Sequence, residues 1–185
     1  AVKREVIDHP LNIPRFELGA LRIMNLLERK IIILPEQIGI SHDELSKNIS
    51  KLLDIANHSI DVNGKWIEIV SEAEVSCLAL SLELKKRKIE NIIAIDERTT
   101  RILSEKPENL EKLMSDRLHT RAKLMRDLSE FSSFRFIRSS ELVYVAYKKG
   151  ILKVYGKKAL EASLYATKYS GSSISFEEID QLNKL

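Results

Sequence analysis

Five acidic residues stand where they could act together on one ligand. One pair follows the apolar run IIAI at 92–95, a second pair opens the helix after the run IEIV, and one lies on the first expected helix: Asp96, Glu97, Glu72, Glu74 and Glu5. In an open parallel sheet, ligands bind outside the carboxyl ends of the strands, where these acids would meet. Converging carboxylates repel each other unless a cation compensates, and oxygen ligands suit Mg²⁺ or Mn²⁺. The five residues therefore indicate a divalent-metal site.

Each acid also has a plain structural explanation. Ser71 and Glu74 have the spacing of a capping box, and Glu72 lies in the first turn of the same helix, where the macrodipole favours an acid. Asp96 can be the N-cap of the helix that follows it, and Glu5 can lie on an exposed helix face. The sequence leaves the metal role and these structural roles open.

The elements that would position these acids alternate between two patterns. Apolar positions at helical spacing predict helices at 1–8, 15–29, 42–56, 71–86, 140–149, 157–169 and 176–184. Short, continuously apolar runs predict buried strands at 31–34, 66–70, 92–95 and 134–138. Asn63 and Gly64 predict a tight turn, with a small hairpin around it. This alternation predicts a three-layer α/β/α domain with a central, mostly parallel sheet.

The segment 104–130 is longer and more charged than one crossover helix requires. It predicts a helical insertion, interrupted near Pro107, that is either a solvated hairpin or a lid or partner surface. Charged helices are usually solvated, which favours the hairpin.

The composition limits the classes of protein to which the chain can belong. Hydrophobic residues make up 44% of the 185 residues and charged residues 31%, which fits one globular domain over 1–185. A formal net charge of +3 does not by itself indicate nucleic-acid binding. The single cysteine excludes an internal disulfide, and no apolar stretch approaches the roughly 20 residues that span a bilayer. With no visible signal peptide, the sequence predicts a cytoplasmic protein without a membrane partner.

The stretch SEAEVSCLALSLELKKRKIENIIAIDERTTRIL (71–103) resembles the core of PIN-domain proteins. In that family an acidic helix start precedes a strand that ends in two acids, and an arginine follows. The later stretches RSSELVYVAYKKGIL and ALEASLYATKYSGSSISFEEID look like the tail of an archaeal-type PIN-like group. The resemblance covers nearly the whole chain and implies the same three-layer α/β/α fold.

The resemblance also implies a function, namely metal-dependent hydrolysis of RNA phosphodiester bonds, either as a toxin or in RNA processing. A bound Mg²⁺ or Mn²⁺ would activate water and neutralise charge on the phosphate of a single-stranded RNA. The matching positions give three catalytic metal ligands and two neighbouring ones: Glu5, Glu74 and Asp96, then Glu72 and Glu97. Arg101, about one turn beyond Asp96, would contact a substrate phosphate or, as exposed helix pairs commonly do, pair with Glu97.

The chain departs from the family at its start. The family's first strand ends in an aspartate that is normally a metal ligand, and no residue before Ala1 supplies it, so we expect an N-terminally truncated domain that is inactive as given. The alternative function is a non-catalytic PIN-like module that binds RNA, a protein partner or a second copy of itself. A phosphate-ligand domain is disfavoured because no glycine-rich loop follows a predicted strand.

Overall fold

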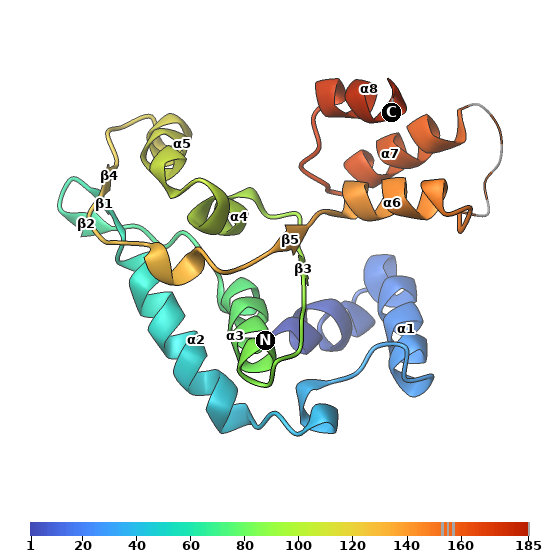
Figure 1. Ribbon diagram of the computed structural model, residues 1–185, viewed down its shortest axis with the longest axis horizontal. Helices are drawn as coiled ribbons and strands as arrows, with labels where there is room; N and C mark the ends of the chain where they lie inside the picture. Colours follow the sequence, from blue (N-terminus) through green and yellow to red (C-terminus); the bar gives the residue numbers. More distant parts are fainter. Residues whose placement is uncertain (153, 155, 157, 185) are drawn as a thin grey trace.

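The computed structural model describes residues 1–152, 154, 156 and 158–184. Helix makes up 62% of the structure and strand only 6%, divided between two small separate sheets (Figure 1). The expected three-layer α/β/α domain with a central, mostly parallel sheet is therefore wrong.

Eight α-helices follow one another along the described chain: α1 (Pro14–Glu28), α2 (His42–Asn57), α3 (Glu72–Lys86), α4 (Arg98–Glu105), α5 (Leu110–Leu118), α6 (Ser139–Lys148), α7 (Ala159–Tyr169) and α8 (Phe176–Lys184). Shorter turns of π- or 3₁₀-helix are η1 (Arg4–Asp8), η2 (Pro10–Asn12), η3 (Pro35–Ile38), η4 (Pro107–Asn109) and η5 (Ser129–Phe131). Every predicted helix overlaps an observed one. The predicted start of α7 at 157 lies outside the described residues.

Local sequence signals account for the helix starts. The Ser71 N–H donates to the Glu74 carboxylate at 2.6 Å, and the Glu74 N–H donates back to Ser71 Oγ at 3.4 Å. Ser41 and Glu44 form the same reciprocal pair at the start of α2. Each pair satisfies backbone donors that the first turn of a helix leaves free.

The strands are short. β1 (Ile60–Val62) pairs antiparallel with both β2 (Lys65–Trp66) and β4 (Lys123–Leu124). The β1–β2 hairpin turns at Asn63 and Gly64, which have φ of 54° and 80°, so the predicted turn is confirmed. β3 (Ile93–Ala94) pairs parallel with β5 (Phe136–Ile137), within the predicted strands 92–95 and 134–138.

The predicted strand 31–34 is absent because its first residues complete the C-terminus of α1. The Ile31 and Ile32 N–H groups both donate to the Leu26 carbonyl, and Lys30 adopts a left-handed conformation with φ of 55°. Pro35 then begins η3. The run lies on the surface instead of in a sheet, with its isoleucines exposed.

The predicted strand 66–70 is reduced to Trp66 because a side chain takes the place of a neighbouring strand. Asn57 Oδ1 accepts hydrogen bonds from the N–H groups of Ile69 and Val70, at 2.8 and 3.1 Å. Its Nδ2 donates to the Val70 carbonyl at 3.0 Å. The backbone that a sheet would have paired is therefore held at the C-terminus of α2.

The main hydrophobic core lies between α2, α3, α4, α5 and the strands. It includes five buried residues of the predicted insertion and the turn after it: Leu110, Met114, Ala122, Leu128 and Phe131. The solvated hairpin expected at 104–130 is therefore wrong, because this segment supplies part of the core and pairs β4 with β1.

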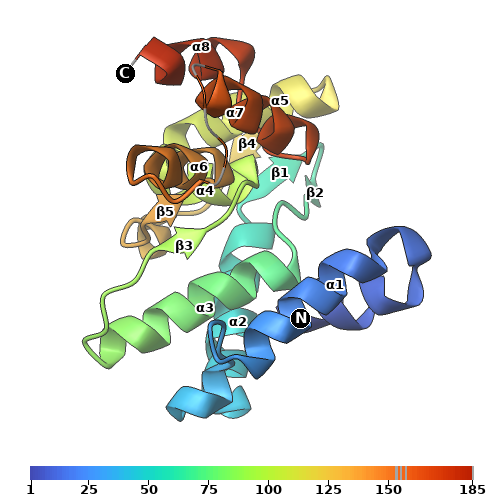
Figure 2. The same cartoon turned by 90° about the vertical axis from the view of Figure 1, so that its right-hand side faces the viewer.

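A second, smaller core joins α6, α7 and α8 around Leu164, Ile174 and Ile179. Figure 2 shows these helices on one side of β3 and β5, with α1, α2 and α3 on the other. None of the described helices is both long and apolar enough to cross a membrane.

Candidate functional site

The five predicted acids lie in two places. Asp96 and Glu97 follow β3, whereas Glu72 and Glu74 open α3 and Glu5 lies on η1. Among the residues that the structure describes, no three His, Cys, Asp or Glu side chains are grouped so that they could hold a metal ion. The contacts of each acid show what it does instead.

Asp96 joins the end of β3 to the C-terminal helices. Its Oδ1 accepts hydrogen bonds from the Ser139 N–H at 3.1 Å and from Ser172 Oγ at 3.2 Å, and its carbonyl accepts one from Ser173 Oγ at 2.9 Å. Asp96 is therefore not the N-cap of α4. Glu97 is the N-cap, since its carboxylate accepts from the Thr100 N–H at 2.6 Å.

Arg101 and Arg138 both pair with acids, and the partner of Arg101 is not the expected Glu97. Arg101, with a side chain only 14% exposed, lies 3.8 Å from Glu105, and no ion pair joins it to Glu97 in the described chain. Arg138 pairs with Glu178 at 2.7 Å. Burial raises the pKa of Glu178, but the Ser175 backbone N–H and Arg138 lower it more, and the net shift is downward. The Arg138–Glu178 pair joins the start of α6 to α8.

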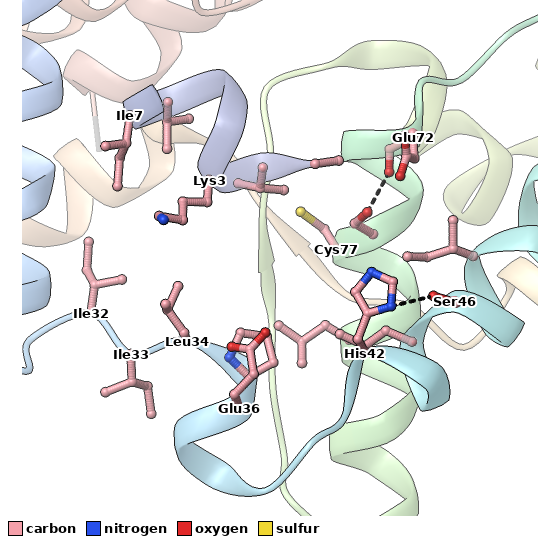
Figure 3. Close-up of a pocket in the computed structure, with 18 of the residues that line it drawn as sticks. Lys3, Ile7, Ile32, Ile33, Leu34, Glu36, His42, Ser46, Glu72 and Cys77 are labelled. Atoms are coloured by element: carbon pink, nitrogen blue, oxygen red, sulfur yellow. Dashed lines mark hydrogen bonds between the residues drawn. The ribbon is translucent and has the colours of Figure 1, made fainter. Parts of the chain in front are cut away.

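A concave, mostly apolar pocket of about 660 Å³ lies between α2, α3 and the N-terminal helices and is called here the α2–α3 pocket (Figure 3). One face of α2 lines it at helical spacing: His42, Leu45, Ser46, Ile49, Ser50 and Leu53. α3 contributes Glu72, Ser76, Cys77 and Leu80. The volume is within the usual range for ligand pockets, about 300–1,000 Å³.

The opposite wall and the mouth of the pocket come from the first 36 residues. Val2, Val6, Ile32 and Ile33 line the pocket and are exposed, at 38, 37, 39 and 49%. The apolar run predicted as a buried strand thus forms part of this wall. Apolar side chains therefore line both the interior and the mouth of the pocket.

Two serine hydroxyls of the pocket bond to groups one turn earlier on their own helices. Ser46 Oγ lies 3.1 Å from Nδ1 of His42, one turn earlier on α2, and Ser76 Oγ donates to the Glu72 carbonyl at 2.7 Å. These hydroxyls therefore add little polarity to the aliphatic lining.

Acidic side chains act on the Cys77 thiol in the pocket. Burial raises the pKa of the Cys77 thiol, and the carboxylates of Glu74 and Glu5 raise it further, while the amino terminus opposes them. Glu36 and Glu72 also line the pocket. Lys3 opposes these acids but lies 3.8 Å from Asp8, on its own helix.

The whole chain exposes more surface than its mass requires. Its accessible surface is 12177 Å², whereas a compact monomer of 21.2 kDa would expose about 9,100 Å². The excess of roughly 3,000 Å² exceeds the ~800 Å² that one partner loses in a standard protein interface. The α2–α3 pocket is one concave part of the surface of the chain.

Sequence reasoning did not find the pocket. The apolar spacing of α2 places Leu45, Ile49 and Leu53 on one face of a helix, but it does not show that these residues both pack on the main core and line the pocket. The available signal was the run at 31–34, which is more apolar than a surface turn requires.

Comparison with known families, characterised proteins and solved structures found no match to this chain.

Proposed function

We propose that this chain is a non-catalytic module that binds a partner protein through the α2–α3 pocket and the apolar surface around it. The observation that supports this most is the accessible surface of 12177 Å², about a third above that of a compact chain of this mass. Large exposed apolar patches on soluble proteins usually mark interaction sites, because water-exposed apolar surface is unfavourable.

A protein fits this surface better than RNA does. The pocket is lined mainly by aliphatic side chains, and Glu36 and Glu72 would repel a phosphate backbone. Nucleic-acid sites need clustered cations, which the pocket lining lacks among the described residues.

The ribonuclease predicted from the family resemblance stays a weaker proposal. Glu74 forms the capping box of α3, and Asp96 bonds to the first turn of α6, so both carboxylates already have structural partners. A metal ion would have to compete with those hydrogen bonds.

Two measurements on the isolated chain distinguish the binding module from the ribonuclease. Nile red, an uncharged apolar dye, should bind the folded chain at a saturable site, with cooperative thermal unfolding as the control that the chain is native. Fluorescein-labelled single-stranded RNA should stay intact in Mn²⁺. Failure to find a saturable dye site would refute the binding module. Metal-dependent RNA cleavage that Asp96→Asn abolishes would establish the nuclease instead.

A further inference from the structure

We propose that the α2–α3 pocket receives the apolar face of a basic amphipathic helix supplied by a partner protein. This inference rests on the proposed function, that the chain is a partner-binding module, and adds the chemical class of the partner.

The dimensions of the pocket match one face of a helix. Its α2 wall runs from His42 to Leu53, a rise of about 16 Å or three helical turns. A volume of about 660 Å³ holds a few large side chains, whereas a whole helix is roughly 10 Å wide. A helix lying across the mouth would therefore insert anchors spaced three or four residues apart.

The walls favour a helix over an extended strand. α2, α3 and η1 satisfy their own backbone hydrogen bonds, so the helical walls offer no edge with which a strand could pair. In the irregular wall, the N–H groups of Ile32 and Leu34 already donate, to the Leu26 carbonyl and to the Gln37 side chain. A strand inserted here would bury unpaired N–H and C=O groups in an apolar environment, at a cost of several kcal/mol. A helix brings its backbone already paired.

The charges around the pocket select a basic partner. Glu36 and Glu72 line it, and Glu5 and Glu74 act on the thiol at its floor; Lys3 and the amino terminus only partly offset them. Lysine or arginine on the flanks of an apolar helix face would complement these acids, whereas acids there would be repelled.

A small apolar ligand would leave most of the uncovered surface unexplained. Phe16 on α1 lies outside the pocket lining and is 49% exposed, on the same face of the helix as Ile23 and Leu27, which line the pocket. A macromolecule that fills the pocket can also cover a neighbouring helix, which a ligand confined to 660 Å³ cannot.

The test uses three synthetic peptides of about 15 residues, the length at which such helices begin to form. One has leucine at helical spacing with lysine elsewhere, the second has the same pattern with glutamate for lysine, and the third alternates leucine and lysine. Cys77, the single cysteine, lies in the pocket and reports occupancy through its alkylation rate. The helical leucine–lysine peptide at about ten times its Kd should slow alkylation about tenfold, and the other two should not.

Two matched substitutions locate the site. Ile33 and Ile92 are both exposed, at 49 and 56%, but only Ile33 lines the pocket. Ile33→Asp should abolish protection of Cys77 by the peptide, and Ile92→Asp should leave it unchanged.

Each other outcome overturns the inference in a distinct way. Equal protection by the glutamate peptide would refute the charge selection, and protection by the alternating peptide alone would refute the helix. Self-association of the chain that Ile33→Asp breaks would make a second copy the occupant. No protection while Nile red still binds would refute the helix but keep the binding module, and loss of dye binding as well would refute both.

Discussion

The apolar stripe of α2 should contribute very unequally to stability along its length. Leu52 is fully buried in the main core, whereas Leu45, two turns earlier, is half-buried and lines the α2–α3 pocket. Leu52→Ala removes buried methyl groups and leaves a closed cavity, at a cost of about 3 kcal/mol. Leu45→Ala enlarges a pocket that is already open to water, so we expect a cost of about 1 kcal/mol.

The two variants can be compared by thermal and urea unfolding. For a chain of this length, about 1 kcal/mol lowers Tm by roughly 2–4 °C, so Leu52→Ala should lower Tm by about 6–12 °C and Leu45→Ala by about 2–4 °C. Because both replacements are identical and lie on one helix, helix propensity cancels between them. Equal losses would show that Leu45 sits in a closed core, and the pocket would not exist as described.

Three further predictions concern single contacts. Glu74→Gln keeps the capping box but removes a charge that raises the pKa of Cys77. The Cys77 thiol should therefore react faster with a disulfide reagent near neutral pH. The control Glu90→Gln, at an exposed surface site, should not change the rate. Asn57→Ala leaves two partly buried N–H groups without their acceptor, which should cost about 1–3 kcal/mol in urea unfolding with α2 retained by circular dichroism. The pKa of Glu178 is lowered in the folded chain, so the stability that its carboxylate contributes is present above about pH 4.5 and is lost as pH falls through the folded pKa. Glu178→Gln should therefore reduce the loss of folding stability at acid pH. An unchanged dependence of stability on pH would contradict the ion pair.

The helices could be predicted because their signals are local. The serine of each capping box lies three residues from its glutamate, and the apolar stripe of α2 repeats every three or four residues. These patterns need no knowledge of what packs against the helix.

The sheet could not be predicted because a buried strand needs partners that the local sequence does not specify. The runs at 31–34 and 92–95 look alike as continuous apolar segments. The run at 92–95 pairs in parallel with a strand 43 residues later in the chain. The first N–H groups of the run at 31–34 instead donate hydrogen bonds to the C-terminus of α1. A short, continuously apolar run is therefore as consistent with a pocket wall as with a buried strand.

The role of Asp96 was also beyond local reasoning. A helix follows two residues later, and an N-cap was the simplest expectation, but the longer side chain of Glu97 reaches the Thr100 N–H. Asp96 is then free to accept hydrogen bonds from Ser139 and Ser172, which are 43 and 76 residues away. Local reasoning also failed for the charged segment 104–130. Its many charges indicate a solvated helix, whereas Leu110 and Met114 are buried by contacts that form only in the tertiary fold.

Methyl NMR of the chain with labelled isoleucines tests the central claim, that a partner helix fills the α2–α3 pocket, most directly. Adding the helical leucine–lysine peptide should shift the methyl signals of Ile33 and Ile49, which line the pocket, and leave Ile92 and Ile60 unshifted. Shifts at Ile92 without shifts at Ile33 and Ile49 would place binding elsewhere and contradict the account. An unchanged spectrum at saturating peptide would contradict it equally.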